Sequence, residues 1–296
     1  MSGIVRLGID GVCVMLIFDL FDLDDKIEIM DIGASAIAEV PIYKVLLEKQ
    51  MAFLTAFDGD ARQITAIENA YGKDFVTVLN YFLFDGGKHD VYLCSPASGM
   101  SSLYKPKTEA LEYFNGFSKF GEVQSIEKIQ TTRLDDIDNV KSPDFLKMDV
   151  QGAELEIIKN GKNKLKDCLA IQLEVSYFNL YEKQPSFGEV DVYLRELGFI
   201  PHMFLDVKRW AIAPTIFNGN FRVPGNQLLE SDIVYVKNPL SPSELNVVQL
   251  KKLAILAHYS FKSFDFCVRL LIELERREVC DVNSHKQYLL NIKNFD

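Results

Sequence analysis

The stretch from residue 144 to 161, DFLKMDVQGAELEIIKNG, constrains the fold most strongly. It begins with a short apolar run of strand length that ends at Asp149, and the following Gln-Gly pair supplies a turn. A helical pattern of apolar residues comes next, and Gly161 stands where a helix needs a left-handed cap. A strand that turns at once into a helix is the repeating unit of open α/β sheets, in which ligands bind at the carboxyl ends of the strands. We therefore expect Lys147 and Asp149 to present charge to a cleft.

The acidic residues of this stretch have two interpretations. Asp149 is the first functional candidate, because it stands where the strand ends. Alternatively, Asp149 and Glu154 only stabilise the N-terminus of the following helix through its dipole. Acidic first turns are common, so the helix pattern alone does not separate the two interpretations.

Composition limits the class of protein. The 296 residues suffice for one large α/β domain with an appended element. Hydrophobic residues make up 48% and charged residues 25%, which is ordinary for a globular protein. The net charge of -10 argues against a nucleic-acid partner, since such binding relies on clustered Lys and Arg.

The N-terminus and the cysteines indicate the compartment. The apolar run at 12–18 is too short to span a bilayer and lacks the flanks of a signal peptide. The 5 cysteines are scattered and form no C-x-x-C pair, which favours free thiols in a reducing environment. We therefore expect a cytoplasmic protein without a transmembrane segment.

A second strand-and-turn pattern, KIEIMDIGAS, covers residues 26–35. Its β-branched residues predict a strand, and Gly33 lets the backbone approach a ligand while exposed N–H groups favour a polar or carboxylate group. The next predicted strand, 51–57, is followed by Asp58, about 25 residues after the glycine turn. A carboxylate at that place can accept hydrogen bonds from both hydroxyls of a ribose. The alternative is that Asp58 is a turn-forming residue before Gly59.

The remaining patterns predict further strands and one capped helix. Strands are expected at 75–84, 89–94, 123–132, 168–175, 199–205 and 233–236. The strand at 89–94 is expected to pair with 75–84 across a glycine turn, and the loop at 95–107 is a candidate lid or wall of the site. A helix should start at the capping box Ser186-Phe-Gly-Glu189 and close at Gly198. The last two strands have no clear helix between them, so they should pair antiparallel.

Other polar residues are weaker or more ambiguous candidates. Glu174 lies near the end of a strongly apolar run, and an unpaired buried charge there would be costly, so it needs either a task or an ion pair with a nearby Lys or Arg. His202 is more naturally structural, as a lone His near an apolar run usually is. No metal-ligand spacing is present, and the acids at 135, 136 and 138 suit a solvated turn better than a cation site.

Three parts of the chain can be distinguished. Residues 1–25 are expected to cover a sheet edge, and 26–238 to form the main domain. Residues 239–296 are expected to form a helical extension, because Ser241-Pro242-Ser243-Glu244 is a strong helix start and 250–257 and 267–274 each place apolar residues on one face. These helices could dock on the domain or form a homo-oligomer.

With these pieces in order, the chain resembles the FkbM family of S-adenosylmethionine-dependent methyltransferases. The resemblance covers about residues 26–237. It rests on DIGAS at 31–35, FDGD at 57–60, SGMSSLYKP at 98–106, TTRLDDI at 131–137, DFLKMDVQGAE at 144–154, and LEVSYFNLY with QPSF over 173–187. It implies a Rossmann-like class I methyltransferase fold: α/β, with a seven-stranded, mostly parallel sheet, an antiparallel last strand and added C-terminal helices.

The resemblance also implies which residues bind S-adenosylmethionine. The turn of Asp31, Gly33, Ala34 and Ser35 would lie against the methionine part, Asp58 would bind the ribose, and Asp85 would lie near the adenine. Lys147 belongs to the same set, and Asp149 would lie beside the sulfonium and the acceptor. The sequence departs from the family pattern in its short glycine turn, and in Asp58, where a Glu is usual.

The implied reaction is O-methylation of a hydroxyl on a sugar, glycan or secondary metabolite. The cofactor carries an activated methyl group, so the protein must align the acceptor and remove a proton. Asp149, Glu154 and Glu174 are the candidate bases, and Asp149 is favoured. Two alternatives remain. An NAD-dependent oxidoreductase is disfavoured by the missing G-x-G-x-x-G and the antiparallel ending. A catalytically silent homologue would bind cofactor, or a partner through its C-terminal helices, without turnover.

Overall fold

The computed structural model describes residues 17, 20–23, 25–34, 40–58, 68, 72, 74–95 and 98–292. The chain divides into two compact units, one formed from 1–27, 40–52 and 239–296 and the other from 28–39 and 53–238. Residues 40–52, expected within the main domain, belong to the first unit. Inside that unit the ammonium of Lys49 lies 5.5 Å from the centre of the Tyr259 ring. The expected cover segment at 1–25 falls largely outside the described residues.

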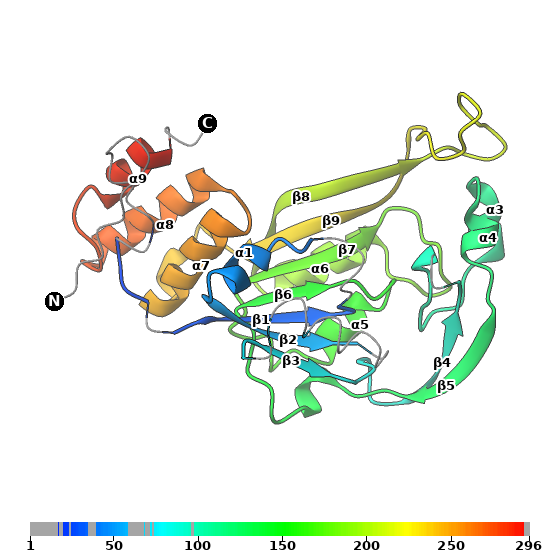
Figure 1. Ribbon diagram of the computed structural model, residues 1–296, viewed down its shortest axis with the longest axis horizontal. Coiled ribbons are helices and arrows are strands. Elements are labelled where there is room, and N and C mark those ends of the chain that lie inside the picture. The colour runs from blue at the N-terminus through cyan, green and yellow to red at the C-terminus, as the bar shows by residue number, and fades with distance from the viewer. Residues whose placement is uncertain are drawn as a thin grey trace. The chain divides into compact units, whose positions relative to one another are not determined.

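The second unit is built on a seven-stranded sheet (Figure 1). The order is β3-β2-β1-β6-β7-β9-β8. The strands are β1 (Ile27–Ile32), β2 (Ala52–Phe57), β3 (Val76–Leu79), β6 (Phe145–Met148), β7 (Ala170–Ser176), β8 (Phe199–Trp210) and β9 (Gln227–Lys237). β9 runs antiparallel to both β7 and β8, whereas the pairs β1 with β6, β6 with β7, and β2 with β3 are parallel. The predicted fold class is confirmed, including the antiparallel final strand.

The two faces of the central strands differ in polarity, because successive side chains of a strand point to opposite faces. Apolar residues of one face pack in a buried cluster with α5 (Glu154–Lys159) and α6 (Phe187–Glu196). On the opposite face Ile29, Phe145 and Ala170 form a buried apolar row, and Asp31, Lys147 and Gln172 form a polar row in register across β1, β6 and β7 two residues further along. This polar row lies near the carboxyl ends of the parallel strands.

One predicted pairing is wrong. The strand β4 (Lys88–Leu93) does not pair with the segment 75–84 but runs antiparallel to β5 (Ser125–Gln130) in a separate two-stranded sheet. The segment before β4 forms backbone hydrogen bonds with the chain after β5. The N–H of Phe84, for example, donates to the carbonyl of Thr132. The strand β3 therefore ends at Leu79, before the end of the expected strand at 75–84, and the expected hairpin with β4 does not form.

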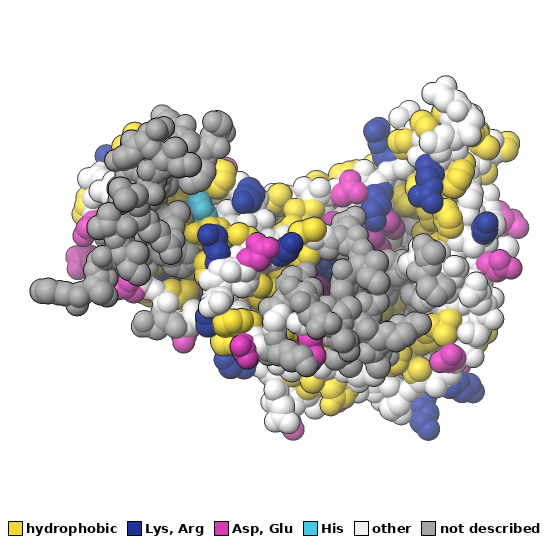
Figure 2. Space-filling model, viewed as in Figure 1, with side chains coloured by type: hydrophobic (Ala, Val, Ile, Leu, Met, Phe, Trp, Pro, Cys, Tyr) yellow, Lys and Arg dark blue, Asp and Glu magenta, His cyan; other side chains and the backbone are white. Residues whose placement is uncertain are grey.

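The connection between β8 and β9 packs against α3 (Thr108–Tyr113) and α4 (Phe117–Phe120). The indole N–H of Trp210 donates to the carbonyl of Asn115 at 2.9 Å, and the N–H of Ala213 donates to the carbonyl of Tyr113 at 2.9 Å. Apolar side chains at the outer end of this connection stay exposed, including Ile216 and Phe217. Figure 2 shows hydrophobic side chains there beside Lys and Arg.

Helix ends test three sequence predictions. The capping box at Ser186 is present, with its hydroxyl accepting from the N–H of Glu189 and the Glu189 carboxylate accepting from the N–H of Ser186. Gly198 follows that helix with φ of 82°, as expected of a left-handed cap. Gly161 has no positive φ, so the cap predicted there is wrong. It is glycine for packing instead, since an added Cβ would lie 2.6 Å from Leu134 Cδ2.

The first unit contains the helices α1 (Lys44–Glu48), α7 (Val247–Tyr259), α8 (Phe264–Arg276) and α9 (Ser284–Ile292). The helix start predicted at Ser241 gives only a 3₁₀ turn, Pro242–Glu244. The long helix α7 begins later, because Asn246 and Gln249 form the capping box that stabilises its N-terminus. Among the helices of the described residues, none has the length and hydrophobicity needed to cross a bilayer.

Candidate functional site

Three strands end together around Gly33. The N–H groups of Gly33 and Ala34 donate to the carbonyl of Phe57, the last residue of β2, at 2.9 and 3.2 Å. On the other side, β6 runs in register with β1 and is followed by Asp149, whose N–H donates to the carbonyl of Ile32 at 3.0 Å. Asp58 and Asp149 therefore lie at the same edge of the sheet, on either side of the glycine turn. Ser35, also expected to contact the cofactor, lies outside the described residues.

Gly33 is required by its surroundings. Its φ is 79°, a conformation that residues with a Cβ rarely adopt. A Cβ built there would lie 2.0 Å from the carbonyl oxygen of Asp149 and 3.2 Å from Val150 Cγ1. The sequence predicts that a ligand approaches the backbone closely at Gly33. On the side that faces β6, the close neighbour is instead the backbone of Asp149.

Asp31 and Lys147 form an ion pair just inside this edge. Lys147 Nζ lies 3.1 Å from Asp31 Oδ1, and their side chains are 18% and 4% exposed. Burial works against the charge on Lys147, but the carboxylates of Asp31 and Asp149 outweigh it and raise the pKa of Lys147. The lysine stays cationic and ties the end of β1 to the end of β6.

The turn after Asp149 is held by Glu154. Gln151 and Gly152 have φ of 55° and 102°, and Glu154 Oε1 accepts hydrogen bonds from the N–H groups of Val150 at 3.0 Å and Gly152 at 3.3 Å. Burial raises the pKa of Glu154 to about 7, although these two donors work in the opposite direction. The geometry gives Glu154 a structural role in holding this turn, through hydrogen bonds rather than through the helix dipole of the alternative interpretation.

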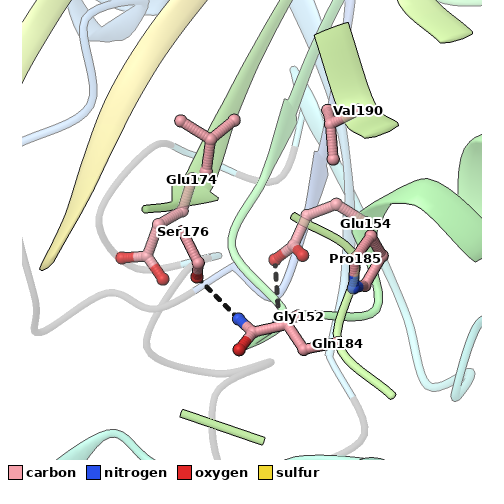
Figure 3. A pocket seen from close by; sticks show the side chains of 8 residues that line it. Gly152, Glu154, Glu174, Ser176, Gln184, Pro185 and Val190 are labelled. Atoms are coloured by element: carbon pink, nitrogen blue, oxygen red, sulfur yellow. Dashed lines mark hydrogen bonds between the residues drawn. The ribbon is translucent and has the colours of Figure 1, made fainter. Parts of the chain in front are cut away.

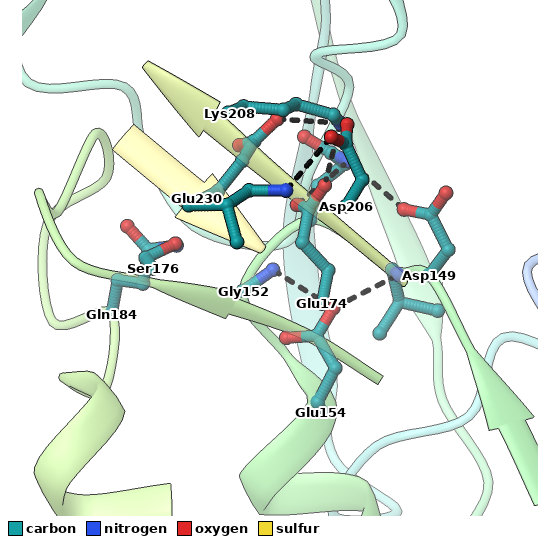
Figure 4. Close-up of polar contacts among 12 residues, drawn as sticks. Asp149, Gly152, Glu154, Glu174, Ser176, Gln184, Asp206, Lys208 and Glu230 are labelled. Atoms are coloured by element: carbon teal, nitrogen blue, oxygen red, sulfur yellow. Dashed lines mark hydrogen bonds and ion pairs between the residues drawn. The ribbon is translucent and has the colours of Figure 1, made fainter. Parts of the chain in front are cut away.

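Glu174 belongs to a cluster of charges on β7, β8 and β9 (Figure 4). Lys208 Nζ lies 3.4 Å from Glu174 Oε2 and 2.8 Å from Glu230 Oε1. Burial raises the pKa of Glu174 well above its usual value, Glu230 and Asp149 add to the effect, and Lys208 opposes it. The ion pair proposed as the alternative for Glu174 is therefore present.

Gln151 joins the two carboxylates. Its Nε2 donates to Asp149 Oδ1 at 3.0 Å and to Glu174 Oε1 at 3.4 Å. Asp149 is exposed, whereas Glu174 is largely buried, so the bridged groups have unequal access to a ligand.

A small pocket lies on the β7 side of this turn (Figure 3). Its wall combines two carboxylates with small and apolar residues: Gly152, Glu154, Glu174, Val175, Ser176, Gln184, Pro185 and Val190. Gln184 Nε2 donates to Ser176 Oγ at 2.6 Å, while Gln184 Oε1 accepts from the N–H of Leu180 at 2.9 Å. The pocket is thus framed by the chain segment that follows β7.

Other candidate residues have local partners. The Asp85 carboxylate accepts from the N–H of Gly87 at 2.7 Å and is 2.7 Å from His89 Nε2. His202 falls at a register shift between β8 and β9. Asp135 accepts from the backbone N–H of Lys164 at 2.8 Å, which explains one acid of the 135–138 cluster without a metal. Within the described residues, no group of three or more His, Cys, Asp or Glu side chains could hold a metal ion.

Three residues of this site were not predicted as site residues from the sequence: Ser102, Tyr181 and Lys208. Ser102 and Tyr181 both bind Gln151, and each lies inside a motif that carried the family resemblance. Those motifs were the signal that could have singled them out. Lys208 gave no signal, because nothing in the sequence around it indicates which carboxylates its strand will face.

Comparison with known protein families identifies one family. Residues 44–201 match the family described as the methyltransferase FkbM domain. No curated protein matches the sequence significantly. Among solved structures, the chain is similar to magnesium protoporphyrin IX methyltransferase from Synechocystis with bound S-adenosylmethionine, at 9% identity and a TM-score of 0.37, over 72% of this chain and 71% of that chain.

Two further similarities have the same character. A ribosomal protein methylase from Lactobacillus delbrueckii subsp. bulgaricus is 11% identical, with a TM-score of 0.35 and coverage of 73% of both chains. A protein of the NADB-Rossmann superfamily from Streptococcus agalactiae is 11% identical, with a TM-score of 0.36, over 92% of this chain and 91% of that chain.

Proposed function

Because this chain belongs to the FkbM methyltransferase family, we propose that it transfers a methyl group from S-adenosylmethionine to a hydroxyl group of a small-molecule or carbohydrate acceptor. One observation carries the proposal: Asp58 and Asp149 follow β2 and β6 at the same sheet edge, on either side of the Gly33 turn. An acid on one side can hold a nucleoside while an acid on the other faces the group that is methylated.

The residues at this edge fit the cofactor. Asp58 has two carboxylate oxygens for the two hydroxyls of a ribose, and Gly33 and Ala34 would line the methionine end. We propose, from the family resemblance alone, that Asp85 lies near the adenine. We assign Asp31 and Lys147 a supporting role, because their side chains are engaged with each other. When bound, S-adenosylmethionine supplies a methyl group that its sulfonium has already activated.

Asp149 is the best base among the three candidates. Glu154 is buried and its Oε1 is directed at two backbone N–H groups. Glu174 is paired with Lys208, and burial favours its protonated form. Asp149 is exposed at the edge, so it can accept the acceptor's hydroxyl proton while the hydroxyl oxygen takes the methyl group. Environments that differ in this way separate the roles of neighbouring carboxylates.

The surroundings of Asp149 favour a hydroxyl-rich acceptor. The pocket beside it presents the carboxylates of Glu154 and Glu174 and the side chains of Ser176 and Gln184. Carboxyl, hydroxyl and amide groups all form hydrogen bonds with hydroxyl groups, whichever protonation state the carboxyl groups have. This chemistry suits a sugar, a glycan or a polyhydroxylated secondary metabolite.

Calorimetric titration of the full chain with S-adenosylmethionine, S-adenosylhomocysteine and NAD tests the cofactor. Methyl transfer from labelled S-adenosylmethionine to a panel of neutral sugars, amino sugars and hydroxylated aromatic compounds tests the acceptor. We expect binding of both sulfur compounds, no binding of NAD, and labelled product from at least one hydroxylated compound. Binding of NAD alone would indicate an oxidoreductase, and binding of S-adenosylmethionine without labelled product a silent homologue; either result would overturn the proposal.

A further inference from the structure

Gln151 occupies an unusual place for its residue type. Its φ of 55° lies in the left-handed region, which glycine and asparagine adopt more easily. The carbonyl of Gln151 accepts a hydrogen bond from the hydroxyl of Ser102 at 2.7 Å. Ser102 is itself fixed, because its backbone exchanges hydrogen bonds with Tyr92 on β4. The strained residue is therefore held by a segment far away in the sequence.

The side chain of Gln151 is oriented by a second distant segment. The hydroxyl of Tyr181, a residue only 1% exposed, lies 3.0 Å from Gln151 Oε1 and 3.2 Å from the carbonyl of Met100. With Oε1 directed at this hydroxyl, Nε2 faces Asp149 and Glu174. The opposite orientation of the amide would place an oxygen against two carboxylates, so the arrangement with Nε2 toward them is the favourable one.

The number of hydrogens matches the number of acceptors. Nε2 carries two hydrogens, and two carboxylate oxygens lie within reach, Asp149 Oδ1 at 3.0 Å and Glu174 Oε1 at 3.4 Å. One oxygen of Asp149 is thus occupied by the amide, and the other can meet a ligand. A glycine or asparagine would suit the turn better but could not make this bridge.

We propose that Gln151 is a positioning residue for methyl transfer, which holds the Asp149 carboxylate toward the acceptor and links it to Glu174. The inference rests on the proposed function, in which Asp149 takes the acceptor proton. Three of the sequence motifs meet at Gln151: the one at 98–106 supplies Ser102, which binds its backbone carbonyl, the one at 144–154 supplies Gln151 itself, and the one at 173–187 supplies Tyr181, which binds its side-chain amide. Gln151 itself touches neither the cofactor nor the acceptor in this scheme.

The test uses Gln151→Leu, which keeps an unbranched Cβ and loses the amide. Its matched control is Ser102→Ala, which loosens the backbone of the same turn and leaves the amide in place. Carbon-13 carboxyl spectra of aspartate-labelled protein report on Asp149, whose resonance is identified by its absence in Asp149→Asn. S-adenosylhomocysteine serves as the calorimetric probe of the cofactor site.

We expect the Asp149 carboxyl resonance at neutral pH to move away from its wild-type chemical shift in Gln151→Leu, because the amide hydrogen bond to Oδ1 is lost. Tyr181→Phe should move it less in the same direction, and Ser102→Ala should leave it unchanged. Affinity for S-adenosylhomocysteine should stay within about twofold in Gln151→Leu. With an acceptor from the panel, kcat should fall about tenfold at unchanged KM.

The failures of the two proposals can be told apart. An Asp149 resonance at the same chemical shift in wild type and Gln151→Leu would overturn the positioning role, even if the enzyme methylates an acceptor. The positioning role would also be overturned if Ser102→Ala moved the resonance as far as Gln151→Leu, because a loosened turn would then explain both shifts. Absence of S-adenosylmethionine binding in wild type would instead overturn the proposed function, and a positioning role in methyl transfer would fall with it.

Discussion

The backbone of Asp149 lies so close to Gly33 that a Cβ on the glycine would be 2.0 Å from the Asp149 carbonyl oxygen. The glycine turn and the strand end that carries the proposed base are therefore one packed unit. A change in either should move the other.

Gly33→Ala tests this contact. We expect a loss of about 2–4 kcal/mol in the free energy of unfolding, since the substitution adds a steric clash to an unfavourable φ. Urea unfolding measures the loss. Gly198→Ala is the matched control, because its φ of 82° is similar but an added Cβ there meets nothing within 4 Å. It should lose only about 1–2 kcal/mol, and equal losses in the two variants would show that the clash with Asp149 is unimportant.

Glu154 should make stability fall as pH rises. Its pKa is raised by burial from 4.5 to about 7, so the folded state binds the proton more tightly than the unfolded state. The stabilisation is complete below pH 4.5 and is lost as pH rises through about 7. Between these limits the unfolding free energy of wild type should drop by about 3 kcal/mol relative to Glu154→Gln.

The measurement for this prediction is urea unfolding of both proteins from pH 3 to 8. Glu189→Gln is a control of opposite sign, because the N–H and hydroxyl of Ser186 lower the pKa of Glu189. The stabilisation that wild type gains from ionised Glu189 should be present at neutral pH and should be lost only as pH falls below the usual range of a glutamate. A difference between wild type and Glu154→Gln that does not vary with pH would contradict the assigned shift.

Lys208 should stabilise the fold through the two carboxylates it joins. Lys208→Met leaves Glu174 and Glu230 without their cation, and we expect a loss of about 1–2 kcal/mol, modest because the lysine side chain is 40% exposed. Glu230→Gln in the same protein should recover part of the loss by removing the repulsion. Lys105→Met breaks an exposed pair with Glu182 and should change the unfolding curve very little. An equal effect of the two lysine substitutions would refute the role of the buried pair.

Much of the architecture was predictable because its signals are local. The stretch 144–161 contains its own strand, turn and helix, and the box at Ser186 closes within four residues. The pairing of β4 was not predictable, because the glycines at 86 and 87 indicate a hairpin whereas the partner strand lies at 125–130. The start of α7 was misplaced for a similar reason: two capping patterns compete within a few residues, and only the one at Asn246 opens the long helix.

The residues of the candidate site also divide into those that local sequence predicts and those that depend on distant contacts. The position of Gly33, Asp58 and Asp149 at the sheet edge was predictable, because each follows a predicted strand directly. The partners of Glu174 could not be identified, since the pair with Lys208 depends on the register of β8 and β9, which contains several shifts. The bridge at Gln151 depends on Tyr181, a contact that spans 30 residues and the two elements α5 and β7.

The division of roles between Asp58 and Asp149 is the central claim. Calorimetry with S-adenosylhomocysteine and methyl transfer to a panel acceptor should be measured for Asp58→Ala and Asp149→Asn, with the exposed Asp167→Ala as a control for lost charge. We predict at least a tenfold loss of affinity in Asp58→Ala. In Asp149→Asn we predict affinity within about threefold of wild type and a rate at least about a hundredfold lower. Equal loss of affinity in the two variants, or full activity in Asp149→Asn, would contradict the account.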